Sequence, residues 1–299
     1  MIYCGIGDEA GNALASQIAA TRELGWHHLE VRNVTVPGHP KANLHDLPDA
    51  AFEMAVAELA AGGVKVFGFA STIGNWAKRI EDPFELTVAE VDRAIPRMQR
   101  LGTRLVRIMS YRVREEADQM EAERFRRLRE ITRRFLDAGL QPVHENCMNY
   151  GGMSPRHAER LLSEIPGLKW VFDTANPVFN QDWSKPAPRP QQDPWDFWTA
   201  VRDHTVHIHI KDARWVPARN DAEYHWPGAG DGAVRRILSD AFARGYSGAL
   251  SIEPHMVAVF HAPSPGGIVP AADNDAVLRA NFVAYGRRLM HLVDELKSR

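Results

Sequence analysis

Short apolar segments alternate with longer amphipathic segments from one end of the chain to the other. Apolar runs of strand length predict buried β-strands, and apolar positions that recur every three to four residues predict helices. The segments that predict strands are 2–6, 27–31, 64–69, 105–109, 140–144, 168–172, 205–210 and 248–252. Helices are predicted at about 10–24, 48–61, 83–100, 116–138, 154–164, 193–202, 231–244 and 274–297.

Glycines placed between these segments support the same alternation. A glycine follows a helical segment just before a strand at Gly25, Gly62, Gly102, Gly139 and Gly245, which is a typical helix stop. Strands that alternate with helices form parallel βαβ units. Eight such units in about 250–300 residues are typical of a (β/α)8 barrel. We therefore expect residues 1–299 to form one α/β domain, a (β/α)8 TIM barrel.

The composition and the charge of the chain argue against nucleic acid and membrane as partners. The chain has 299 residues and a formal net charge of −2, with acidic and basic residues interspersed. The sequence has no stripe of basic residues of the kind that binds nucleic acid. It also has no apolar run that approaches the roughly 18 residues needed to span a bilayer. The first residues lack a signal-peptide pattern, and Cys4 and Cys147 form no C-x-x-C motif. These features predict a soluble, cytoplasmic protein whose partner is a small molecule.

Polar side chains stand at the ends of the last four predicted strands. Glu145 ends PVHE, Asp173 ends VFD, His209 lies in VHIHIKD, and Glu253 ends LSIE. In a (β/α)8 barrel the carboxyl ends of all strands meet at one mouth, where active sites form. Four neighbouring strands therefore each deliver a ligand-type side chain to one place.

The two histidines of VHIHIKD need separate interpretations. Side chains alternate along a strand, so His207 and His209 face the same way, with His207 deeper in the strand. We expect His209 to be a metal ligand and His207 to be a buried structural histidine.

Three carboxylates directed at one another repel unless one is protonated or a cation lies among them. Three carboxylates and one imidazole suit Mn²⁺ first, with Mg²⁺, Co²⁺ or Zn²⁺ as alternatives, and the lack of thiolates argues against a structural zinc. Four protein ligands on a six-coordinate ion leave two positions for substrate oxygens. The alternative is a set of buried ion pairs with basic residues near the strand ends, such as Lys211 and Arg214.

The motifs FDTAN, HIHIKD and GYSGALSIEPH, together with the number of strand–helix units, resemble the xylose isomerase-like TIM-barrel superfamily of sugar isomerases and epimerases. The resemblance covers essentially the whole chain. It implies a metal site made of Glu145, Asp173, His209 and Glu253. It also implies that the two Glu ligands act as acid and base on opposite faces of a sugar.

Two positions depart from the ketose 3-epimerases of this superfamily. Gly151 stands where those enzymes tend to carry a second Glu, and Asn176 stands where they tend to carry His. A 3-epimerase of free ketohexoses is therefore not favoured. In some relatives that act on 3-keto-glycosides a His near the metal serves as base, and this resemblance makes His144 a further candidate catalytic residue beside Glu145 and Glu253.

Such a site supports removal of a proton next to a sugar carbonyl through a metal-bound enediolate. Return of the proton to the opposite face is epimerisation, and return to the neighbouring carbon is isomerisation. We expect one of these two reactions. The alternative is an eliminase or deglycosidase of 3-keto-glycosides, a carbon–oxygen or carbon–carbon lyase. Candidate substrate-binding residues near strand ends are Asn176, Arg214, Trp76 and Glu30.

Other functions fit the sequence less well. The segment GIGDEAG, with Glu30 ending the next strand, resembles the fingerprint of an NAD-binding oxidoreductase, but its glycine spacing departs from G-x-G-x-x-G. An endonuclease IV-like phosphodiesterase needs further His ligands, which the strand ends GFASTIGNW and RIMSYR lack. A scaffold subunit beside a catalytic partner would not need all four ligand-type residues.

Two long segments, 177–194 and 257–272, follow the sixth and eighth strands and are expected at the mouth of the barrel. Apolar anchors such as Phe179 and Trp183 are costly to leave in water. We expect these segments to form a lid or a subunit interface, which leaves a homo-oligomer or a partner subunit open.

Overall fold

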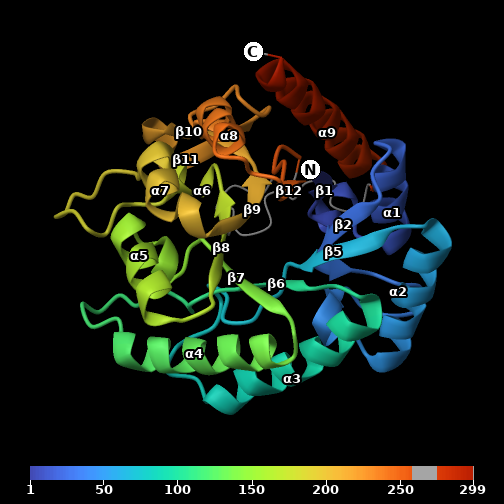
Figure 1. Ribbon diagram of the computed structural model, residues 1–299, viewed down its shortest axis with the longest axis horizontal. Helices are drawn as coiled ribbons and strands as arrows, with labels where there is room; N and C mark the ends of the chain where they lie inside the picture. Colours follow the sequence, from blue (N-terminus) through green and yellow to red (C-terminus); the bar gives the residue numbers. More distant parts are fainter. Residues whose placement is uncertain (258–274, 299) are drawn as a thin grey trace.

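The computed structural model describes residues 1–257 and 275–298. An eight-stranded parallel sheet curves into a nearly closed barrel, and helices surround it (Figure 1). Strand neighbours follow the order β1-β12-β9-β8-β7-β6-β5-β2. The barrel strands are β1 (Ile2–Gly5), β2 (His28–Val31), β5 (Lys65–Phe69), β6 (Leu105–Ile108), β7 (Gln141–Glu145), β8 (Lys169–Asp173), β9 (Thr205–Ile210) and β12 (Ala249–Ile252). The predicted single-domain TIM barrel is confirmed.

The helices lie where the amphipathic segments predicted them, within a few residues at each end. Their bounds are α1 (Leu14–Glu23), α2 (Asp49–Gly62), α3 (Phe84–Leu101), α4 (Glu121–Asp137), α5 (Pro155–Glu164), α7 (Pro194–Val201), α8 (Val234–Ala243) and α9 (Asp275–Lys297). The last helix, α9, packs beside α1 on the outside of the barrel (Figure 1). None of the described helices is both long and apolar enough to cross a membrane.

Packing between strands and helices explains why the apolar runs form strands. A parallel strand in a barrel is buried on both faces, so its sequence is nearly all apolar. In β8, Phe172 is fully buried and packs against Phe197 and Trp198 of α7, with ring centroids 6.0 and 5.4 Å away. Asp173 follows on the opposite face and is also fully buried. Side-chain alternation thus gives the helices an apolar surface and gives the barrel interior a carboxylate.

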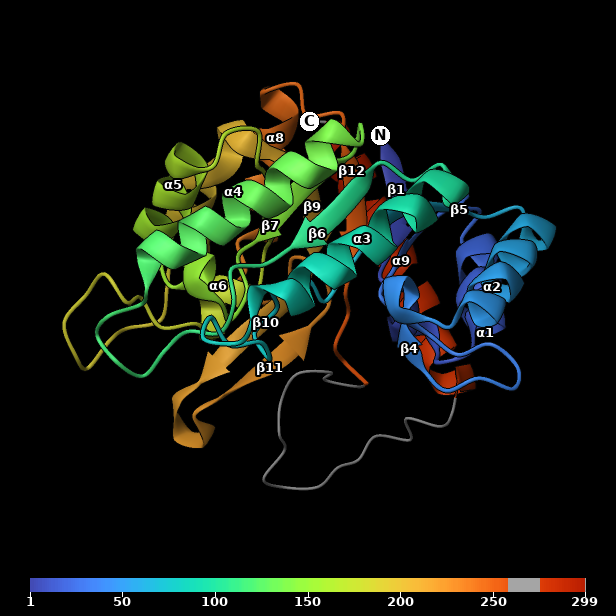
Figure 2. The same cartoon turned by 90° about the horizontal axis from the view of Figure 1, so that it is seen from below.

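Three small elements were not predicted. A short hairpin pairs β3 (Asn33–Val34) with β4 (Ala42–Asn43), and α6 (Asn176–Phe179) follows β8. A longer hairpin pairs β10 (Asp212–Val216) with β11 (Asp221–His225) and projects beyond the barrel (Figure 2). No strand or helix was predicted in these stretches.

Asp212 holds the start of the longer hairpin to the chain that follows it. Its carboxylate accepts hydrogen bonds from the backbone N–H groups of Gly228, Gly230 and Gly232, each at 2.9 Å. A side chain at Gly230 would lie only 2.5 Å from the Asp212 carboxylate. The glycines of WPGAGDG therefore allow the backbone to approach closely enough to donate these bonds.

Of the two long segments expected to form a lid or an interface, 177–194 is described and includes most of α6. Its role remains a prediction. The greater part of the second segment, 258–272, lies outside the described residues.

Candidate metal centre

Four side chains from neighbouring strands converge at the mouth of the barrel. Glu145 ends β7, Asp173 ends β8, His209 lies in β9, and Glu253 follows β12. Each is at most 2% exposed, and one ligand-type atom from each lies within 4.8 Å of the others. The strand register produces this convergence, because Asp173 pairs with His209 and the Glu253 N–H donates to the Ile210 carbonyl at 3.1 Å. We call these four residues the mouth cluster.

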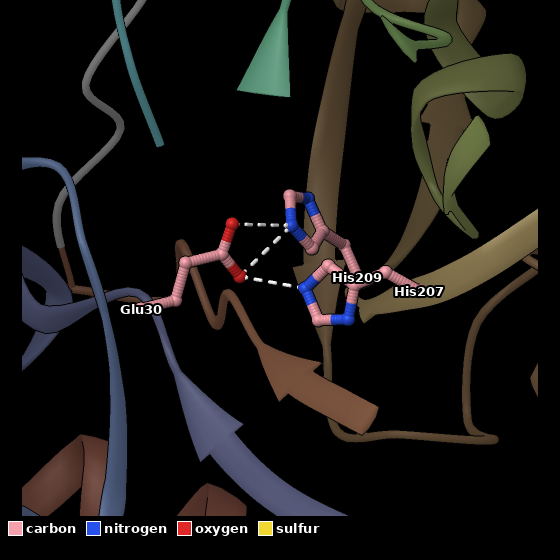
Figure 3. A group of neighbouring side chains, drawn as sticks. All are labelled: Glu30, His207 and His209. Carbon is pink, nitrogen blue, oxygen red and sulfur yellow. Dashed lines mark hydrogen bonds and ion pairs between the residues drawn. The ribbon is translucent and has the colours of Figure 1, made fainter. Parts of the chain in front are cut away.

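His207 and His209 point to the same side of β9, as their spacing predicted, and both meet Glu30 of β2 (Figure 3). His207 Nε2 lies 2.8 Å from Glu30 Oε2, and His207 Nδ1 lies 3.2 Å from the Ala249 carbonyl oxygen. His209 Nε2 lies 3.1 Å from both Glu30 oxygens, whereas its Nδ1 lies 3.3 Å from Glu145 Oε1. His209 therefore reaches the mouth cluster, while both nitrogens of His207 have other partners.

Glu30 contacts both imidazoles and is 1% exposed. Burial alone would raise the pKa of this carboxyl, but His209 and His207 hold it well below its usual range. A carboxylate bonded to the far nitrogen of a ligand-type imidazole fixes the orientation of the ring. The contacts of Glu30 are those of a positioning residue, and its expected contact with substrate remains a prediction. The sequence analysis missed the pairing because Glu30 and His209 are distant in sequence.

Basic side chains pair with the carboxylates of the mouth cluster. Lys211 Nζ lies 3.0 Å from Asp173 Oδ2 and 2.9 Å from Glu253 Oε2. Arg107 Nη1 donates to Glu145 Oε2 at 2.8 Å, and Arg32 Nη1 donates to Glu253 Oε1 at 2.6 Å. The ion-pair alternative from the sequence is therefore present for Lys211.

Arg214 does not join this network. It lies on β10 with its side chain 52% exposed, and its Nε is 3.6 Å from Asp231. Its expected role in binding substrate stays a prediction.

The balance of burial against nearby charge sets the ionisation of the mouth cluster. Burial would raise the pKa of Glu145, but Arg107 and His209 lower it to about 2. Burial would likewise raise the pKa of Glu253, but Lys211, His255 and Arg32 hold it well below its usual range. For Asp173, burial outweighs the attraction of Lys211, and its pKa rises to about 7. At neutral pH both glutamates are thus anions.

The glycine-rich segment after β1 builds a second network beside the first. In the 3-10 turn Gly7–Ala10, Asp8 accepts from Arg32 Nε at 2.9 Å, and Glu9 accepts from Arg32 Nη2 at 3.1 Å. Glu9 Oε1 also lies 2.8 Å from His255 Nδ1. The segment GIGDEAG therefore provides carboxylates that hold Arg32 against Glu253. Sequence reasoning considered only its glycines and missed Asp8 and Glu9.

His144 is not brought into the mouth cluster. It lies on the opposite face of β7 from Glu145, with its ring 4.8 Å from that of Trp170 and its Nε2 3.0 Å from Ser110 Oγ. Burial lowers its pKa to about 3, so the imidazole is neutral. These contacts do not support its expected role as a base, which remains a prediction from resemblance.

Asn176 and Trp76 do lie at the site. The Asn176 amide donates to Glu145 Oε1 at 3.3 Å, and its backbone N–H donates to Asp173 Oδ1 at 2.7 Å. The side-chain Oδ1 of Asn176 is buried and has no hydrogen-bond partner within the described residues. Trp76 lines a small cavity at the mouth cluster.

Two adjoining cavities open at this mouth. The inner cavity has a volume of about 140 Å³, and its wall includes Arg107, Glu145, Lys211 and Glu253. The outer cavity has a volume of about 540 Å³. Trp76 and Cys147 line both cavities, so the two lie side by side.

Comparison with known proteins agrees with this architecture. The model of the xylose isomerase-like TIM barrel family matches residues 18–274. No protein with a curated description matches the chain.

Solved structures resemble the chain over nearly its whole length. One is a xylose isomerase-like TIM barrel protein from Mycobacterium smegmatis in complex with magnesium, with 18% identity, a TM-score of 0.64, and 95% of this chain and 97% of that chain covered. Another is 3-keto-D-glucoside 4-epimerase from E. coli, with 15% identity, a TM-score of 0.62, and 96% and 99% covered. A third is D-psicose 3-epimerase with D-tagatose from Clostridium cellulolyticum H10, with 15% identity, a TM-score of 0.64, and 98% and 99% covered. At these identities the likeness shows the fold.

Replacing Glu30 tests whether it holds the imidazoles in place. Removing one partner of a buried ionic group leaves the others uncompensated, which typically costs about 3–5 kcal/mol. We expect Glu30→Ala to lower the free energy of unfolding by about 3 kcal/mol or more, measured by urea denaturation in the presence of a chelator. The matched control is Glu53→Ala, because Glu53 forms an ion pair with Arg100 in which both side chains are more than half exposed. This pair is expected to contribute less than about 1 kcal/mol. Equal, small losses in the two variants would contradict the role of Glu30.

Proposed function

The chain belongs to the xylose isomerase-like TIM barrel family, and on this premise we propose that it is a divalent-metal-dependent sugar isomerase or epimerase that moves a proton next to a carbonyl. The observation that carries the proposal is the mouth cluster, in which three carboxylates and one imidazole lie within 4.8 Å of one another. Structural relatives include two sugar epimerases, and another is bound to magnesium.

The donor set fits a hard divalent cation. Carboxylate oxygens with one imidazole suit Mn²⁺, Mg²⁺ or Co²⁺ better than a soft metal. The position of Lys211 supports the same conclusion, because its ammonium group lies between Asp173 and Glu253, where positive charge is attracted. We propose Glu145, Asp173, His209 and Glu253 as the ligands, with Mn²⁺ as the first candidate.

A divalent ion held there would polarise a sugar carbonyl and make the adjacent C–H more acidic. Glu145 and Glu253 are anions at neutral pH and flank the inner cavity, so either can accept that proton. Asn176 stays a candidate substrate-binding residue, because its side-chain Oδ1 has no partner within the described residues, although Asn176 lines neither cavity. Trp76 offers an apolar surface to the C–H side of a sugar ring.

Elimination from a 3-keto-glycoside is the second candidate, and the environment of Gly151 favours it over 3-epimerisation of a free ketohexose. A Cβ at this position would lie 2.4 Å from His144 Cε1 and 2.6 Å from Leu161 Cδ1. The second Glu of the ketose 3-epimerases therefore has no room here. The fold likeness to a 3-keto-D-glucoside 4-epimerase is consistent with keto-glycoside substrates.

His209→Ala tests the proposed ligand set. Loss of residues that merely support a ligand lowers metal affinity about 10–100-fold, so loss of the ligand itself should lower it at least 100-fold. Titration calorimetry with Mn²⁺ measures the change. His207→Ala is the control and should mainly lower the free energy of unfolding, by about 2–3 kcal/mol. The reverse pattern in the two variants would show that the histidines are wrongly assigned.

Lys211→Met tests whether the lysine and the metal compete for the same carboxylates. Two unit charges about 4 Å apart interact by about 4 kcal/mol at an effective dielectric constant of 20. We therefore expect the variant to bind Mn²⁺ at least about tenfold more tightly and to be less stable without metal. Lys65→Met removes an exposed lysine at the start of β5 and should change neither property. Weaker metal binding by Lys211→Met would contradict the competition.

The reaction type can be tested with a panel of ketoses, aldoses and 3-keto-glycosides incubated with Mn²⁺-loaded protein in D₂O. We expect deuterium at the carbon beside the carbonyl, detected by NMR, because the removed proton exchanges with solvent. The product distinguishes an epimerase, an isomerase and an eliminase. Product without deuterium indicates a base shielded from water. If metal is bound but neither turnover nor exchange occurs across the panel, proton abstraction on these sugars is ruled out.

A further inference from the structure

The outer cavity is not explained by the proposed reaction, which needs only the inner one. Its volume of about 540 Å³ lies within the range of roughly 300–1,000 Å³ typical of pockets for drug-sized ligands. The inner cavity, at about 140 Å³, lies below that range. Because Trp76 and Cys147 belong to both walls, the outer cavity lies directly beside the one at the mouth cluster.

The wall of the outer cavity is mainly apolar. Trp76, Val113, Met148, Met153 and Trp183 contribute to it. Indole rings and thioethers form favourable contacts with flat aromatic groups, and methionine adapts to different shapes.

Four polar side chains stand in the same wall: Asn149 is buried and hydrogen-bonded, Arg112 and Gln181 are exposed, and Asn180 is half-buried without a side-chain hydrogen bond to the described residues. The side-chain Oδ1 of Asn149 accepts hydrogen bonds from Ser110 Oγ and from the Gly151 backbone N–H. Its side-chain Nδ2 donates to the backbone carbonyl of Glu145. A second sugar would bring several hydroxyls into a wall whose buried amide is already bonded.

Hydrogen bonds hold the wall in its shape. The backbone N–H of Trp183 donates to the backbone carbonyl of Met153 at 2.9 Å. The buried Gln192 amide donates to the carbonyls of Gly152 at 2.8 Å and Gln181 at 3.0 Å. The Arg189 guanidinium lies 4.1 Å from the centre of the Trp183 ring, which fixes the indole from one side. A preformed wall of this kind loses little conformational entropy when a ligand binds.

We propose that the outer cavity binds a flat, aromatic aglycone, so that the substrate is an aryl glycoside of a keto-sugar whose ring lies at the mouth cluster. The position of the sugar ring in this inference rests on the proposed function. The binding of an aromatic aglycone rests on the outer cavity alone. The ligand class follows from the adjacency of the two cavities, from the mainly apolar wall and from the pair of indoles.

The test compares two glucosides that differ only in the aglycone. Titration calorimetry on Mn²⁺-loaded protein measures the affinities for 4-nitrophenyl β-D-glucopyranoside and methyl β-D-glucopyranoside. We expect the aryl glucoside to bind at least about tenfold more tightly. Trp183→Ala should reduce this preference to less than about threefold. Trp195→Ala is the matched control, because Trp195 is also half-buried, has Arg236 3.7 Å from its ring centre and does not line either cavity. It should leave the preference unchanged.

A preference for cellobiose over the aryl glucoside would assign the outer cavity to a second sugar and overturn the inference, as would equal affinities for the two glucosides. Binding of 4-nitrophenol to metal-free protein separates this inference from the proposed function. If 4-nitrophenol binds and Trp183→Ala abolishes the binding, the aglycone site stands even where metal binding and sugar turnover fail. Turnover of free sugars without any preference for an aryl group would instead support the proposed function and overturn the aglycone site.

Discussion

Three carboxyl groups and an imidazole can share a buried space of less than 5 Å only if a carboxyl group is protonated or positive charge lies among them. This constraint shapes the whole mouth of the barrel. Lys211 lies between Asp173 and Glu253, Arg107 pairs with Glu145, and Arg32 pairs with Glu253. Asp8 and Glu9 in the turn after β1 hold Arg32 in this position.

The same constraint links structure to the proposed activity. Internal cations keep Glu145 and Glu253 ionised in a buried position, which is the state that a base requires. The Lys211 ammonium marks a position where the fold attracts positive charge. A divalent ion would meet the same attraction and would offer, in addition, open positions for substrate oxygens. We therefore regard the ion pairs as the metal-free form of a metal centre rather than as an alternative to one.

The parts of this molecule that were predicted correctly from the sequence depend on local patterns and on topology. Alternating apolar and amphipathic segments gave the strands and helices, because a parallel barrel needs both. Glu145, Asp173, His209 and Glu253 could be grouped because the ends of neighbouring parallel strands meet at one mouth. Glu30 could not be assigned in the same way, since its contact with His209 joins strands that are not neighbours, and Arg107 could not because it lies within β6 rather than at its end.

Strand alternation also explains the difference between two neighbours in the sequence. His144 and Glu145 are adjacent, yet one packs against Trp170 and the other faces the barrel interior. Resemblance suggested a catalytic role for His144, and only the strand geometry shows where its ring lies. The β10–β11 hairpin was missed for another reason, since its start depends on backbone N–H groups donating to Asp212 from residues sixteen to twenty positions later.

The central claim is that these four residues form one metal centre. Anomalous diffraction from crystals soaked in Mn²⁺ tests it most directly, because the signal locates the ion without assumptions about activity. The account predicts one strong peak within bonding distance of Glu145, Asp173, His209 and Glu253, with Lys211 displaced from its present position. A peak among Glu9, Glu253 and His255 instead, or no peak with Lys211 still between Asp173 and Glu253, would contradict it.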